Sequence, residues 1–101
     1  MRMVADHVAH RYGVTWNTYR EHPPGTDLDR VSVDFWGPAG RGDHLGPMKR
    51  RRISRYIRHL DWGPAWRWCI NGRRGYLPSG ARFDPKGGAA WNAGHVHITY
   101  R

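Results

Sequence analysis

The chain has 101 residues and a formal net charge of +9, with 17 lysines and arginines against 8 acidic residues. Its length predicts a single domain over residues 1–101, and its single cysteine excludes an intramolecular disulfide or a cysteine zinc cluster. The positive charge favours polyanions such as nucleic acid, anionic lipid or an acidic cell wall, although a basic solubilising surface explains it equally well. No apolar run reaches the length of a membrane span or a signal-peptide core, so we expect synthesis in the cytoplasm without a signal peptide.

The first half of the chain predicts one helix and one strand. A short N-terminal helix that stops at Gly13 is indicated by apolar residues at four-residue spacing, namely Val4, Val8 and Tyr12. Residues 15–30 are polar and contain two prolines and a glycine in a row, so they predict a loop. Residues 31–36 alternate and are rich in β-formers, which predicts a strand, and the glycine-rich residues 37–46 predict another loop.

The second half predicts a helix followed by a hairpin. Pro47 occupies the position that proline prefers at a helix start, and the segment ends before Gly63. An apolar stripe at helical spacing runs through it, formed by Ile53, Tyr56, Ile57 and Leu60. Residues 66–70 predict a strand, Asn71-Gly72 a hairpin turn, and residues 74–77 the returning strand. This order of elements predicts an α+β domain, a small antiparallel sheet with two or more helices packed on one face.

The last segment, residues 95–100, predicts a strand after a loop over residues 78–94 that is rich in glycine, proline and alanine. Side chains alternate along a strand, so one face of this strand presents His95, His97 and Thr99. By the same test, one face of the strand over residues 31–36 presents Ser32, Asp34 and Trp36. If the two strands pair, the aspartate and both histidines meet on a shared polar face of the sheet.

A carboxylate and imidazoles are suitable ligands for Zn²⁺, and catalytic zinc sites use three protein ligands plus water. The sequence therefore predicts a zinc site on the sheet that includes Asp34 and His97. His22 is the best candidate for the third ligand, because two prolines hold its loop just before the Asp34 strand. Histidines without any metal are the alternative explanation of the same residues.

Three stretches together resemble the M15-type zinc peptidases: His22-Pro-Pro-Gly, Ser32-Val-Asp34-Phe, and the terminal His95-Val-His97-Ile-Thr. This family comprises D-alanyl-D-alanine carboxypeptidases and L-alanyl-D-glutamate endopeptidases, including many phage endolysins. The resemblance covers about residues 16–100. It implies that His22, Asp34 and His97 are the zinc ligands, and that His95 lies near the substrate and the metal-bound water. Arg11 and Arg20 are candidate counterparts of the family's substrate-binding arginine, of which we choose Arg20, and we expect Trp36 to line the substrate site.

Two departures from the family pattern affect these assignments. The gap between His22 and Asp34 is longer than in compact members, and Asp29 lies at the shorter spacing but outside an apolar-x-Asp strand. Asp34 is therefore preferred as the ligand. Many members carry a carboxylate as general base where this chain has Gly94. The role of base then falls to His95, or to another carboxylate such as Asp43 or Asp84.

The sequence thus predicts zinc-dependent hydrolysis of a peptide bond in bacterial cell-wall peptidoglycan. Water on the metal would attack the carbonyl while His95 exchanges protons. The expected partner is the stem peptide of the wall, and we expect a monomer without a membrane span, of phage origin. One alternative is a basic nucleic-acid-binding protein or nuclease, supported by the run Lys49–Arg52 and the abundant Trp and Tyr. The other is a non-catalytic wall-binding or virion module that is stabilised by its metal.

Overall fold

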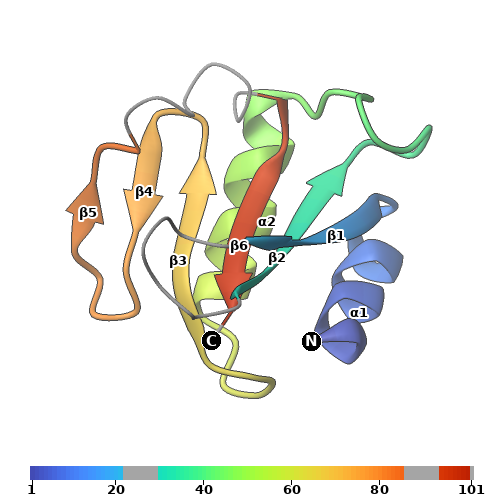
Figure 1. The fold of residues 1–101 in the computed structure, drawn as a ribbon. Helices are drawn as coiled ribbons and strands as arrows, with labels where there is room; N and C mark the ends of the chain where they lie inside the picture. Colours follow the sequence, from blue (N-terminus) through green and yellow to red (C-terminus); the bar gives the residue numbers. More distant parts are fainter. Residues whose placement is uncertain (22–29, 86–93, 101) are drawn as a thin grey trace.

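The computed structural model describes residues 1–21, 30–85 and 94–100. Within these ranges, six strands form one antiparallel sheet in the order β1-β2-β6-β3-β4-β5, accompanied by two helices (Figure 1). This arrangement confirms the predicted α+β class. The elements are α1 (Arg2–Tyr12), β1 (Thr15–Glu21), β2 (Arg30–Trp36), α2 (Pro47–Arg58), β3 (Trp66–Asn71), β4 (Arg74–Tyr76), β5 (Arg82–Phe83) and β6 (Val96–Tyr100).

Both predicted helices are present, with starts and stops that follow from their end residues. α1 ends where Gly13 adopts a left-handed conformation with φ of 65°, which glycine enters without steric cost. α2 begins at Pro47, as predicted, but it ends at Arg58, two residues before the end of the predicted apolar stripe. Leu60 still packs against the core from beyond the helix. With 11 and 12 residues, neither of these described helices is long and apolar enough to cross a membrane.

The hydrophobic core lies on one face of the sheet, between the strands and the helices. Figure 1 shows α2 lying along that face, behind the central strands. Phe35 of β2, Ile98 of β6, Ile53 of α2 and Val8 of α1 are all fully buried members of this core. Since strand side chains alternate, the residues next to Phe35 and Ile98 point to the opposite face, where the polar side chains gather.

Two strands lie where loops were expected. The prediction of a loop over residues 15–30 was wrong for Thr15–Glu21, which forms β1 and pairs with β2 along its whole length. β1 is an edge strand, and among its described side chains, those of residues 15–18, Trp16 packs against the core. The loop predicted over residues 78–94 contains the two-residue strand β5, which extends the sheet beyond β4.

Candidate metal centre

The pairing of β2 with β6 determines how the polar residues meet. Asp34 lies directly opposite His97, and Ser32 lies directly opposite Thr99. This register confirms that the two predicted strands pair and that their polar faces coincide. All four side chains are buried, on the face of the sheet that α2 does not cover.

Asp34, His95 and His97 form a compact cluster of possible metal ligands. The Nδ1–H of His97 donates to Oδ1 of Asp34 at 2.8 Å, and Nε2 of His95 lies 3.5 Å from the same oxygen. One ligand atom from each residue can be chosen so that all three lie within 4.8 Å of one another. Ligand atoms around a tetrahedral zinc lie about 3.3–3.5 Å apart, because each is about 2.0–2.1 Å from the ion. The donor set and its spacing therefore fit one metal ion with small adjustments, although they do not identify the metal.

Hydrogen bonds fix the orientation of the His97 ring. Its Nδ1 proton faces the Asp34 carboxylate, so in the neutral imidazole the opposite nitrogen, Nε2, accepts a hydrogen bond from the Thr99 hydroxyl at 2.9 Å. The Ser32 hydroxyl lies 3.2 Å from Thr99 Oγ1 and continues the chain. These partners hold the ring in one orientation, and in a metal site one of them would remain on the nitrogen that does not bind the ion.

The electrostatics of the cluster keep Asp34 ionised. Burial by itself raises the pKa of this carboxyl group. Hydrogen bonds from His95 and His97, together with the positive charge these rings can carry, outweigh burial and leave the pKa of Asp34 below its ordinary value. A buried carboxylate held in its charged form by two histidines is suited to binding a cation.

His95 differs from His97 in what holds it. Its ring stacks on the indole of Trp36, with centroids 4.1 Å apart and planes inclined by 20°. Trp36 is itself 8% exposed, and its indole N–H has no hydrogen-bond acceptor among the described residues. The stack therefore fixes the plane of the His95 ring next to Asp34 and places a buried donor beside it.

The structure describes the other predicted site residues, His22, Arg20 and Trp36, to different extents. His22 lies outside the described residues. The Arg20 backbone pairs with Val31 between β1 and β2, whereas its side chain is outside the described part of the structure. Trp36 is in the site through its stack on His95. The structure thus brings together Asp34, His95, His97 and Trp36 of the predicted set.

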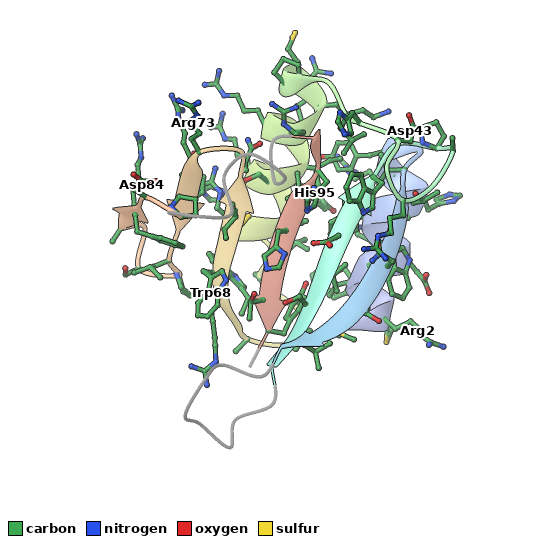
Figure 2. The ribbon with its side chains drawn as sticks, turned by 45° about the horizontal axis from the view of Figure 1, so that its top comes forward. Arg2, Asp43, Trp68, Arg73, Asp84 and His95 are labelled. Atoms are coloured by element: carbon green, nitrogen blue, oxygen red, sulfur yellow. The ribbon has the colours of Figure 1, made fainter. Side chains whose placement is uncertain are left out.

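The alternative bases, Asp43 and Asp84, do not lie in this cluster. The Asp43 carboxylate accepts the backbone N–H of Ala39 at 2.9 Å and so closes its own loop. Asp84 follows β5 at the far edge of the sheet, away from His95 (Figure 2). A Cβ at Gly94 would lie 2.5 Å from the ring of His44, so the space that a side chain at Gly94 would need is already occupied.

Sequence reasoning missed three residues next to the cluster. Asn17 of β1 lies opposite Asp34, and its buried Oδ1 has no hydrogen-bond partner among the described residues. Trp68 of β3 lies opposite Thr99 on the other side of β6. His44 stacks on Trp36 with centroids 6.3 Å apart. Residues 15–21 show no alternation of polar and apolar side chains, so no signal in the sequence would have found Asn17.

The sequence matches no protein-family model, and comparisons with curated proteins and with solved structures found no significant match.

Proposed function

We propose that this chain is a zinc-dependent hydrolase that cleaves a peptide bond in bacterial cell-wall peptidoglycan. The observation that carries the proposal is the buried Asp34, His95 and His97 cluster, whose ligand atoms lie within 4.8 Å of one another. Zinc is preferred because the donors are imidazole nitrogens and a carboxylate oxygen. The choice of substrate rests on the resemblance of the His22, Asp34 and His95-x-His97 pattern to wall peptidases.

In this proposal Asp34 and His97 hold the metal with His22 as the third protein ligand, and His95, the remaining member of the cluster, would lie beside the ion without binding it. A bound zinc supplies Lewis acidity and makes a water molecule nucleophilic at neutral pH. The Thr99 hydroxyl holds the His97 ring in place, and the histidine rings keep the carboxylate of Asp34 charged. The strands place Asp34 and His97 face to face, and binding a cation would require His97 to give up one of its two hydrogen bonds, to Asp34 or to Thr99.

His95 moves the proton in this mechanism. Hydrolysis adds the oxygen of water to the carbonyl carbon, breaks the C–N bond and delivers a proton to the departing amine. Imidazole is suited to accepting the first proton and donating the second near neutral pH. The stack on Trp36 at 4.1 Å fixes the plane of the His95 ring beside Asp34. In this proposal, residues of β2 and β6 bind the metal, and His95, the residue just before β6, transfers the proton.

The proposal is tested by incubating purified peptidoglycan with the zinc-loaded protein and analysing the released fragments by mass spectrometry. The expected result is cleavage of one type of peptide bond, abolished by chelation and restored by zinc. His95→Ala should lower the rate by about 10²–10⁴-fold while the zinc content stays near that of the wild type. The exposed His10 offers the matched control, since His10→Ala should change neither quantity.

Zinc content also separates the roles of the histidines. His22→Ala should lose zinc if His22 is the third ligand. If His95→Ala loses zinc instead, His95 is a ligand and the proposed division of roles is wrong. A protein that binds zinc stoichiometrically but releases no fragment from peptidoglycan would be a metal-stabilised binding module, and the proposed hydrolase activity would be rejected.

A further inference from the structure

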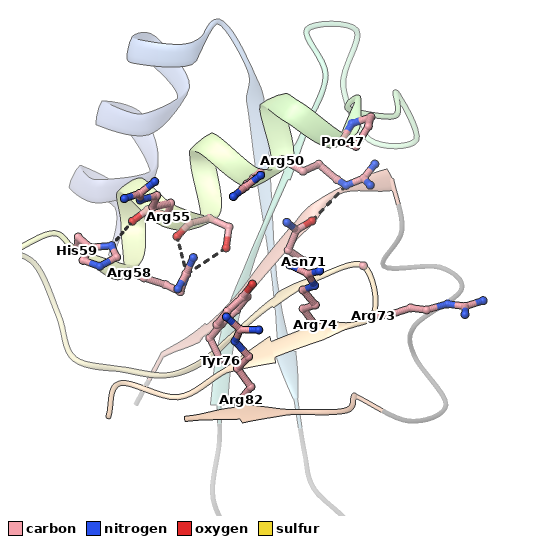
Figure 3. A pocket seen from close by; sticks show the side chains of 13 residues that line it. Pro47, Arg50, Arg55, Arg58, His59, Asn71, Arg73, Arg74, Tyr76 and Arg82 are labelled. Carbon is pink, nitrogen blue, oxygen red and sulfur yellow. Dashed lines mark hydrogen bonds between the residues drawn. The ribbon is translucent and has the colours of Figure 1, made fainter. Parts of the chain in front are cut away.

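A groove of about 450 Å³ lies between α2 and the strands β3–β5 (Figure 3). It is on the helix-covered face of the sheet, because Ser54 of α2 contacts Cys69 of β3 at 3.4 Å and Arg58 of α2 covers the ring of Tyr76 of β4 at 3.8 Å. The Asp34, His95 and His97 cluster is on the opposite face. The groove is therefore separate from the candidate metal centre.

Arginine dominates the lining of this groove. Its described lining residues include no aspartate or glutamate. Arginines come from both walls, as Figure 3 shows for Arg50, Arg55 and Arg58 on the helix and for Arg74 and Arg82 on the strands, with Arg73 in the turn between β3 and β4. Positive charges from two walls, without carboxylates between them, produce a strong local attraction for anions.

Two of these arginines are held in place by neutral partners. Arg50 donates through Nε to Asn71 Oδ1 at 3.2 Å and through Nη1 to the Leu45 carbonyl at 2.7 Å. Arg58 donates through Nε to the Ser54 carbonyl at 3.3 Å. These bonds orient the guanidinium groups without neutralising their charge. Less side-chain entropy is therefore lost when an anion binds.

The lining also indicates the class of anion. The planar, always charged guanidinium group suits phosphate oxygens, which it can bind through two donors. Proteins that hold single-stranded nucleic acid add aromatic rings on which the bases stack. Two of the described lining residues carry rings: Tyr76 is buried with Arg58 over it, and His59 is exposed, with its Nδ1 2.8 Å from the Arg55 carbonyl. The described lining thus offers guanidinium groups along two walls to a phosphate backbone, and a single exposed ring, the imidazole of His59, to a base.

We propose that the groove binds a single anionic chain with a phosphodiester backbone and no bases, of the poly(glycerol phosphate) type found in cell walls. The inference rests on the proposed function only in placing the protein at a cell wall. Bound there, the protein would be retained on the wall by one face of its sheet while the opposite face meets the stem peptide.

The test is a fluorescence-anisotropy titration of labelled poly(glycerol phosphate) with the full chain at several salt concentrations. The groove variant is Arg74→Gln/Arg82→Gln, and the matched control is Arg2→Gln/Arg41→Gln; all four of these side chains are exposed. The groove variant should bind on the order of tenfold more weakly. The plot of log K against log salt should become less steep by about 1.4, because two arginines are replaced and each phosphate contact on a single strand contributes about 0.7 to the slope. The control should change affinity by less than about twofold.

Two outcomes would overturn the inference. Equal weakening by both double variants would show that diffuse charge, and not the groove, attracts the polymer. Much tighter binding of oligothymidine or duplex DNA with the same number of phosphates would identify nucleic acid as the partner.

The metal-free protein and His95→Ala should bind the polymer like the wild type. If peptide hydrolysis fails while this binding persists, the proposed function fails and the groove assignment stands.

Discussion

The substitution Asp34→Asn tests the metal centre with the least disturbance of the fold. Asparagine has nearly the same shape, but it lacks the charge that the structure places 2.8 Å from His97 Nδ1. Structural zinc sites with four protein ligands contribute about 10–16 kcal/mol, or about 3 kcal/mol per ligand. Losing one ligand should therefore weaken zinc binding roughly 100-fold, since each 1.4 kcal/mol corresponds to about tenfold in affinity.

Thermal unfolding measures this loss directly. Zinc at about 100 times its Kd should stabilise the wild type by about 2.7 kcal/mol, which raises the Tm of a domain of this size by about 10 °C or more. At the same zinc concentration the Asp34→Asn variant should gain only about 0.4 kcal/mol, or about 2–3 °C. Its metal-free form should also unfold earlier than the wild type, because a buried hydrogen bond to a charged group contributes about 1.5–3 kcal/mol.

The matched control is Asp43→Asn, which removes the same charge from a carboxylate that closes its own loop. This variant should keep the full zinc-induced rise in Tm. The reasoning would be refuted if Asp34→Asn kept the wild-type rise, or if Asp43→Asn lost it to the same extent.

Three further predictions concern the fold around the site. Burial raises the pKa of the Cys69 thiol to about 11, so its reaction with a thiol reagent at pH 8 should require unfolding. Because the thiol ionises more easily in the unfolded chain, the free energy of unfolding should fall by about 2–3 kcal/mol between pH 9 and 11. Replacing Cys69 with alanine should remove the thiol's part of the alkaline loss, while the part due to Tyr100, whose pKa burial raises to about 12, should remain. Gly94→Ala should cost about 1–2 kcal/mol in urea unfolding because the new Cβ meets the His44 ring, and His44→Ala should relieve most of that cost in a double-mutant cycle. Ile53→Ala should cost about 2–5 kcal/mol, since the side chain is fully buried between α2 and the sheet; a cost below 1 kcal/mol would contradict its place in the core.

Much of the sheet's centre could be predicted because its residues follow simple periodicities. The alternation in β2 and β6 predicted that Asp34 and His97 share a face, and the observed register puts them directly opposite each other. Asn71-Gly72 likewise predicted the hairpin that joins β3 and β4. These features depend on local pattern and on turn chemistry, both of which are visible in the sequence.

The edges of the sheet could not be predicted in the same way. β1 is an edge strand whose contact with the core comes from Trp16, so its composition resembles that of a loop. β5 has two residues and is defined by its pairing with β4. The positions of Asn17 and His44 beside the site depend on β1 and on the loop before α2. These are long-range contacts, for which the sequence contains no periodic signal.

The most direct test of the account is a crystal structure of the zinc-loaded protein with anomalous data collected at the zinc edge. We predict one strong anomalous peak about 2.0–2.2 Å from both the Asp34 carboxylate and an imidazole nitrogen of His97, with a coordination position left open for water. An ion bound only by exposed histidines such as His10, or no peak at the Asp34 and His97 pair, would contradict it.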